Sequence, residues 1–173
     1  MKAIVVYESY WGNTAAVARA IAEGLGSGAR AMSTAEATGE AIADVDLIVA
    51  GSPIIAFRLP TEKTRADMAA KPGKAPSPPD VSHPAMRTWL EALPKGKGRA
   101  AAFETGFKLS PGGSANAILK LLESCGYLPA ATKQRFLVKG SYGPVRDGEL
   151  ERAKSWGAEL AQEGVKPTFC CKR

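Results

Sequence analysis

The sequence predicts an α/β protein built on a five-stranded parallel sheet. Short apolar runs alternate along the chain with stretches of helical periodicity, which is the pattern of parallel strands joined by crossover helices. Two of the runs, residues 2–7 and 46–51, are nearly continuous in apolar residues, as in strands whose two faces are both covered. The length of 173 residues and the apolar content of 45% suit a packed domain of this class.

Each element has its own signal. Residues 2–7 predict the first strand, and a helix is expected over 15–25, where Val17, Ile21 and Leu25 recur at fourfold spacing on one face. Further strands are expected near residues 29–33, 46–51, 99–104 and 135–139. Further helices are expected at about 84–93, 114–125 and 148–163, the first of them with Ser82 or His83 as its cap.

A proline-rich excursion separates the third strand from the next helix. Residues 71–84 contain five prolines, and Pro60 opens the segment upstream. Because proline fixes its own φ and has no N–H, this run is predicted to be neither a central strand nor a regular helix. We therefore expect one domain over residues 1–165 that carries the excursion at about 60–84, followed by a C-terminal tail over 166–173.

The turn between the first strand and the first helix carries the most specific signal for a binding site. The first amides of a helix have no partners within the helix, and the helix dipole places partial positive charge at that end. Hydroxyl side chains and free amides in such a turn are expected to bind a phosphate group. The turn lacks the Gly-Lys-Ser/Thr of a Walker loop and the Gly-x-Gly-x-x-Gly of dinucleotide sites. Its residues are Ser9, Tyr10, Trp11, Gly12, Asn13 and Thr14.

This turn resembles the phosphate-binding loop of the flavodoxin family. Ser9, Gly12, Asn13 and Thr14 match the family pattern, and the Gly-Ser-Pro after the third strand is common among its members. The chain looks especially similar to small flavodoxin-domain proteins of high-GC bacteria, which share its opening and a closing run like that over residues 140–153. The resemblance implies a flavodoxin-like three-layer sandwich with parallel strands in the order 2-1-3-4-5. It also implies a non-covalently bound FMN and electron transfer with a redox partner protein.

In that strand order, ligands bind outside the carboxyl ends of the strands, where the chain reverses direction. The loop over residues 51–60 is apolar and long, and the loop over 104–113 leaves amides near the ligand. The resemblance implies that these two loops flank the flavin ring, with stacking by Phe57 or Phe107; ordinary core packing is the alternative for each phenylalanine. The predicted contacts in the two loops are Ser52, Pro53, Ile54, Phe57, Glu104, Thr105, Gly106 and Phe107.

Three features depart from the family pattern. Trp11 takes the place of a hydroxyl residue that donates to phosphate. Glu8 puts a carboxylate beside the turn, where it would repel phosphate unless it points away. Carrier flavodoxins are typically acidic, whereas this chain has a net charge of +6 and a pI near 9.3.

Two alternatives therefore stand beside an FMN-dependent electron carrier. One is a flavodoxin-fold module that has lost FMN, with Trp11 blocking the site, and that serves as a binding or regulatory protein. The other is an FMN-dependent NAD(P)H or quinone oxidoreductase, although the sequence contains no nicotinamide fingerprint.

Other functional classes find less support in the residues. The densest basic group, residues 95–99, is predicted to be a solvated loop without interleaved aromatics, so nucleic acid is not an expected partner. No spacing of cysteine and histidine predicts a zinc site, and His83 is expected on the surface rather than in a hydrolytic dyad.

The remaining cysteines and the N-terminus bear on the compartment. Cys125 is expected to be a small buried hydrophobe, and Cys170 and Cys171 to lie in an exposed terminus. No apolar run approaches the roughly 20 residues that cross a bilayer, and the N-terminal run lacks the features of a signal peptide. We therefore expect a cytoplasmic protein with no membrane insertion.

Overall fold

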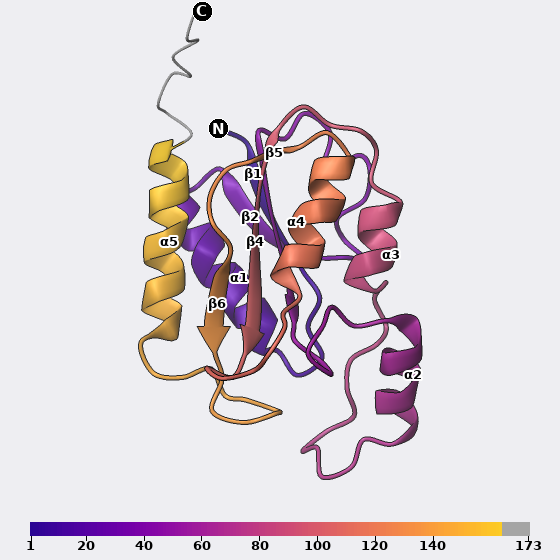
Figure 1. Cartoon of the computed structure of the whole chain (residues 1–173). Coiled ribbons are helices and arrows are strands. Elements are labelled where there is room, and N and C mark those ends of the chain that lie inside the picture. The colour runs from indigo at the N-terminus through magenta and orange to yellow at the C-terminus, as the bar shows by residue number, and fades with distance from the viewer. Residues whose placement is uncertain (164–173) are drawn as a thin grey trace, which may run out of the picture.

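The computed structural model describes residues 1–163, so Cys170, Cys171 and the predicted tail lie outside the described residues. Strands and helices alternate along most of the chain (Figure 1). The elements are β1 (Ala3–Tyr7), α1 (Asn13–Leu25), β2 (Ala29–Ser33), β3 (Leu47–Pro53), α2 (Glu62–Ala70), α3 (Met86–Glu91), β4 (Arg99–Gly106), α4 (Ala115–Ser124), β5 (Leu128–Pro129), β6 (Gln134–Leu137) and α5 (Glu149–Glu163).

The sheet confirms the predicted strand order. All pairs are parallel, and the strands follow one another as β2-β1-β3-β4-β5, with β6 also paired to β4. The fifth position was predicted as one strand and is filled by two. β5 pairs with the first residues of β4, Arg99 and Ala100, whereas β6 pairs with its last four residues, Phe103 to Gly106. The missing N–H of Pro129 does not interrupt this pairing, because the N–H groups of Leu128 and Ala130 on either side of it donate to the carbonyl oxygens of Gly98 and Ala100.

Helices cover both faces of the sheet, which makes the three predicted layers (Figure 1). On one face, Ile4 and Val6 of β1 pack with buried side chains of α3 and α4, such as Leu90 and Ile118. The other face buries Val5 with side chains of α1 and α5. Adjacent residues of β1 therefore serve opposite cores, which explains why its sequence is apolar without alternation.

Helices α1 and α5 approach closely because glycine lies at their contact. A Cβ on Gly24 would come 1.9 Å from the Lys154 carbonyl oxygen, and one on Gly157 would come 2.2 Å from the Ile21 carbonyl oxygen. Small residues at both positions let the backbones meet, and this contact fixes α1 on the sheet. The N-terminus of α1 is the end that carries the predicted phosphate turn.

The proline-rich excursion begins with a helix that the sequence did not predict. Helix α2 lies away from the sheet, near the ends of β4 and β6 toward which their arrows point (Figure 1). Residues 71–84 form no helix or strand, as predicted. The next helix begins at Met86, with Ala85 in the cap position instead of the predicted Ser82 or His83. In residues 1–163, no helix is long and apolar enough to cross a membrane.

Candidate functional site

Three loops at the carboxyl ends of β1, β3 and β4 surround a pocket of about 280 Å³. A fourth segment, after β6, closes it with Val138 and Ser141. The lining is mostly apolar on the β3 and β4 side and carries hydroxyl and amide groups on the β1 side. The lining residues from the three predicted loops are Ser9, Tyr10, Trp11, Asn13, Thr14, Pro53, Ile54, Ile55, Ala56, Phe57, Thr105, Gly106, Phe107 and Ser110.

The structure thus brings most of the predicted contacts together. Gly12 lies in the same turn without lining the pocket, while Ser52 and Glu104 are buried beside it with their side chains engaged elsewhere. Ile55, Ala56, Ser110, Val138 and Ser141 line the pocket and were not predicted. Ile55 and Ala56 lie within a loop that the sequence singled out, whereas Val138 was predicted as part of the strand at 135–139 and lies just after β6, and Ser141 follows it.

The turn after β1 has the geometry of an anion site. Gly12 adopts a left-handed conformation, with φ of 83°, and forms the cap of α1 without any side-chain hydrogen bond. The first N–H groups of α1 are therefore open to an acceptor at this end. Ser9 Oγ is the one buried side-chain polar atom in residues 1–163 that has no hydrogen-bond partner. A buried hydroxyl without a partner is costly, and a bound acceptor would satisfy it.

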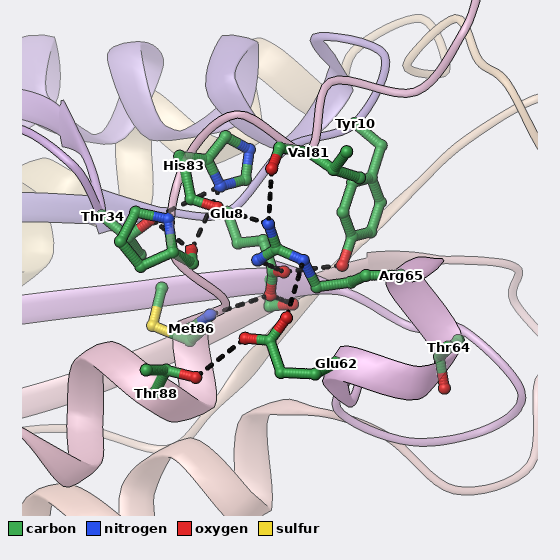
Figure 2. A network of polar contacts seen from close by, with 12 residues as sticks. Glu8, Tyr10, Thr34, Glu62, Thr64, Arg65, Val81, His83, Met86 and Thr88 are labelled. Atoms are coloured by element: carbon green, nitrogen blue, oxygen red, sulfur yellow. Dashed lines mark hydrogen bonds and ion pairs between the residues drawn. The ribbon is translucent and has the colours of Figure 1, made fainter. Parts of the chain in front are cut away.

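Glu8 does not line the pocket, and its carboxylate is engaged by other side chains. Its carboxylate is fully buried and accepts a hydrogen bond from the Tyr10 hydroxyl at 2.6 Å (Figure 2). It accepts another from the Ser52 hydroxyl at 3.0 Å. It also accepts from the Met86 N–H at 3.2 Å, so it caps α3 from a distance. Burial, followed by the negative charge of Glu8, raises the pKa of Tyr10 far above its ordinary value, so this hydroxyl stays a donor. The Glu8 carboxylate is thus occupied by three donors and does not line the pocket in which a phosphate is expected.

Arg65 of α2 neutralises this carboxylate. Its Nη1 lies 3.1 Å from Glu8 Oε1, and both side chains are almost completely buried. The same guanidinium donates to the carbonyl oxygens of Val81 and His83 and lies 3.7 Å from the Glu62 carboxylate (Figure 2). One side chain thus ties α2, the end of the excursion and the residue before the phosphate turn together. Sequence reasoning missed Arg65 because it stands in a stretch without apolar periodicity.

Contacts from the excursion hold residues 8–11, which lie at the turn after β1, in place. Each of residues 8–11 forms one contact of 2.9 to 3.2 Å with a different residue of the segment 65–83. The excursion therefore supports the turn. The pairs are Glu8 with Arg65 Nη1, the Ser9 carbonyl with His83 Nε2, the Tyr10 carbonyl with the Asp80 N–H, and Trp11 Nε1 with the Ser77 carbonyl.

Trp11 is one of these anchors. Its indole N–H donates to the Ser77 carbonyl oxygen at 3.0 Å, and its ring meets Tyr142 edge-on at 4.9 Å between centroids. Asn13 donates to the Tyr142 carbonyl oxygen, so the turn also binds the segment after β6. Trp11 therefore lines the pocket while its indole N–H is hydrogen-bonded to the excursion.

The prediction that His83 lies on the surface was wrong. His83 is 7% exposed, and its ring lies parallel to that of Tyr10 at 6.3 Å. Its Nε2 faces the Ser9 carbonyl oxygen at 3.2 Å, while Nδ1 lies 3.2 Å from the Pro84 carbonyl oxygen and 3.4 Å from Thr34 Oγ1. The prolines next to it in the sequence suggested an exposed helix start, whereas the excursion folds back over the turn and covers the ring.

The tight turn at Asp80 gives the excursion a dependence on pH. The Asp80 carboxylate accepts from the hydroxyl and N–H of Ser82, and these bonds lower its pKa below the ordinary 3.8. A lowered pKa contributes stability above the ordinary value, and this is lost as the pH falls through the folded-state value. We expect the unfolding free energy of the native protein to exceed that of Asp80→Asn at pH 7, and the difference to vanish near pH 2. Urea unfolding at both pH values measures it; a difference independent of pH would contradict the prediction.

The loop after β3 is a tight reverse turn. Ile55 and Arg58 exchange both backbone hydrogen bonds at 3.1 Å, and the two residues between them, Ala56 and Phe57, have φ values of 48° and 65°. Residues other than glycine rarely adopt this left-handed backbone conformation, and the turn holds Phe57 61% exposed at the mouth of the pocket. The Ile54 N–H donates to the Thr105 carbonyl oxygen, which joins this loop to β4.

The loop after β4 is fastened by Arg135. Its Nε lies 2.7 Å from Glu104 Oε1, and its other nitrogens donate to the carbonyl oxygens of Phe107, Ser110 and Gly112. Glu104 Oε2 accepts from the N–H groups that open α4, at 2.7 and 2.9 Å. Glu104 is 1% exposed, and its side chain joins Arg135 to the start of α4 instead of lining the pocket.

Thr14 and Thr105 link the two sides of the pocket. Their hydroxyl oxygens lie 2.8 Å apart, and both residues are almost fully buried. The phosphate turn and the loop after β4 are thereby held in one arrangement. Cys125 is partly buried and packs at the edge of the core, remote from the pocket, and no three metal-ligating side chains gather within residues 1–163.

No protein-family model matches the sequence, and neither does any curated protein. Solved structures match it closely in shape. A flavodoxin from the domain Archaea superposes with a TM-score of 0.65 at 21% identity, over 96% of this chain and 100% of that one. Oxidised flavodoxin 1 from Bacillus cereus superposes at 0.63 and 17% identity, over 94% and 98% of the two chains.

A third similar structure is a flavodoxin, WrbA-like protein from Agrobacterium tumefaciens. Its TM-score is 0.55 at 22% identity, with 94% of this chain and 96% of that one covered. The likeness extends over nearly the whole chain in each comparison, and it agrees with the strand order and the layers described above. The chain therefore has the flavodoxin-like fold.

Proposed function

We propose that this protein binds FMN non-covalently in the pocket and transfers electrons through it. The observation that carries the proposal is the buried, unpartnered hydroxyl of Ser9 beside the open N-terminus of α1. A phosphate group is the acceptor that such a turn takes up most readily. When bound, FMN supplies the electron chemistry, and the chain binds it, orients it and sets its surroundings.

The residues present fit such a ligand. Ser9 Oγ and the first amides of α1 would hold the phosphate, and Arg65 keeps Glu8 from opposing it. Phe57 and Phe107 line the pocket from two neighbouring loops, where aromatic side chains can contact a flat ring. The hydrogen bond from Trp11 to Ser77 supports an open site rather than the alternative in which the indole blocks it.

The test is a titration of the purified protein with FMN and with riboflavin, which lacks the phosphate. We expect FMN to bind, with quenched flavin fluorescence, and more tightly than riboflavin. Ser9→Ala should lower the affinity for FMN by about 10- to 100-fold and leave the affinity for riboflavin unchanged. This loss corresponds to one hydrogen bond to a charged group, which contributes about 1.5–3 kcal/mol.

Ser124→Ala is the matched control, because Ser124 is an exposed serine at the end of α4. Its affinities should equal those of the native protein. Absence of FMN binding to the native protein would overturn the proposed function. Equal weakening of both flavins by Ser9→Ala would instead contradict the assignment of Ser9 to the phosphate.

A further inference from the structure

The mouth of the pocket displays large apolar side chains to solvent. Phe57 is 61% exposed, Phe107 44% and Leu109 89%. Single exposed hydrophobics are ordinary, but these three belong to the two loops that border one pocket. With Arg58 and Lys108 between them, these residues form what we call the mouth patch: Phe57, Arg58, Phe107, Lys108 and Leu109.

The mouth patch is held in place. Phe57 and its neighbour Ala56 keep left-handed conformations that cost each non-glycine residue about 1–2 kcal/mol. The Phe57 carbonyl oxygen accepts from the Gly113 N–H at 3.0 Å, and Arg135 fixes the Phe107 carbonyl oxygen. Strain maintained at an exposed aromatic residue is typical of positions selected for contact with another molecule.

The charge of the mouth patch is positive and unbalanced. The loop over residues 53–60 contains no acidic residue, and in the loop over 104–113 the one carboxylate, Glu104, is buried and paired with Arg135. Arg58 and Lys108 are exposed, and within residues 1–163 neither forms an ion pair. The whole chain carries a net charge of +6. A partner with carboxylates around an apolar centre would complement this surface.

We propose that the mouth patch docks an acidic redox protein, which brings its electron-carrying centre next to the pocket. The inference rests on the proposed function, since it places the partner at the same site. It commits to a partner of charge opposite to this chain. Attraction between the two charges would speed their encounter and orient the complex, while the apolar side chains would exclude water from its centre.

The experiment uses the FMN-loaded protein and, as the probe, an acidic plant-type [2Fe–2S] ferredoxin, with basic cytochrome c as the probe of opposite charge. Binding is measured by calorimetry at low and at physiological salt. The test variant is Arg58→Glu with Lys108→Glu, and the control is Lys95→Glu with Lys97→Glu, at the opposite end of β4. Each change removes two positive units, so both double variants lower the net charge from +6 to +2.

We expect ferredoxin to bind the native protein, more weakly at higher salt, and cytochrome c not to bind. The mouth-patch variant should lose about tenfold or more in affinity, against a loss of about threefold or less in the control, because the contact is local. Leu109→Ser, which leaves the net charge unchanged, should also lower the affinity for ferredoxin. Equal losses in the two double variants would overturn the proposal, since overall charge would then explain them.

A second outcome would also overturn it. If the mouth-patch variant lost affinity for NADPH while ferredoxin showed no binding to the native protein, the patch would be a nucleotide site. FMN titration of every variant separates this inference from the proposed function. Failure of the native protein to bind FMN would refute the function, whereas unchanged FMN affinity with no ferredoxin binding would refute only the docking surface.

Discussion

Replacing Arg65 with leucine is expected to lower the free energy of unfolding by about 3–5 kcal/mol, because it leaves the buried Glu8 carboxylate without its counter-charge. The Val81 and His83 carbonyl oxygens also lose their donor. Urea unfolding followed by circular dichroism measures the loss. Arg65→Lys keeps the positive charge but lacks the planar guanidinium, so its free energy of unfolding should lie between those of the native protein and Arg65→Leu.

The matched control is Lys63→Met, on the same helix. Lys63 pairs with Asp67 four residues on, and both side chains are largely exposed, so the loss should stay within about 0.5 kcal/mol. If Arg65→Leu lost no more stability than Lys63→Met, the buried pair would have no part in holding the excursion.

Arg65→Lys folds with fewer losses and also reports on the site. Arg65 contacts Glu8, the residue before the turn that we propose binds the phosphate of FMN. The affinity for FMN should therefore fall by about tenfold, or 1.4 kcal/mol, while the affinity for riboflavin stays constant. Loss of affinity for both flavins would show that Arg65 supports the whole pocket rather than the turn.

The burial of Arg65 in α2 could not be predicted from the sequence. Helix α2 buries one residue only, and that residue is charged, so no apolar face predicts the helix. By contrast, α1 buries Val17, Ala18 and Ile21 on one face, and its periodicity predicted it. His83 was judged as an isolated polar residue, for which the surface is the usual place, and Glu8 only as a negative charge beside the turn. Their burial depends on a partner 57 residues away from Glu8, and no local pattern encodes that pairing.

The strands were predictable for a related reason. β1, β3 and β4 are buried on both faces, and each contains an uninterrupted apolar run, over residues 3–7, 47–51 and 100–103. β5 has two exposed residues, Leu128 and Pro129, and left no such signal. Ser9 and Gly12 were placed correctly in a turn before α1, because that turn is a local feature of strand, glycine and helix, whereas Asn13 and Thr14, also assigned to the turn, are the first residues of α1. Glu104 was predicted as a contact from its position alone, which does not reveal that its side chain caps α4.

Replacing Arg135 with leucine is expected to cost about 3 kcal/mol of unfolding free energy, because Glu104 then stays buried with only the two N–H groups of α4 as donors. The loop from Phe107 to Gly112 also loses three carbonyl contacts. Lys154→Met, which removes an exposed ion pair with Glu23, is the control and should change stability by about 0.5 kcal/mol or less.

The ligand pattern of Arg135→Leu should differ from that of the Arg65 variants. Arg135 fastens the loop after β4, on the side of the pocket where we propose that the flavin ring lies, so the affinities for FMN and riboflavin should both fall by about tenfold, as the loop loses its order before binding. Arg65 lies behind the phosphate turn, so its variants should distinguish the two flavins. Two buried carboxylates at the ends of β1 and β4, each paired with a distant arginine, would then control the two halves of one site. A selective loss of FMN in Arg135→Leu would contradict this division, because it would place the loop after β4 on the phosphate side.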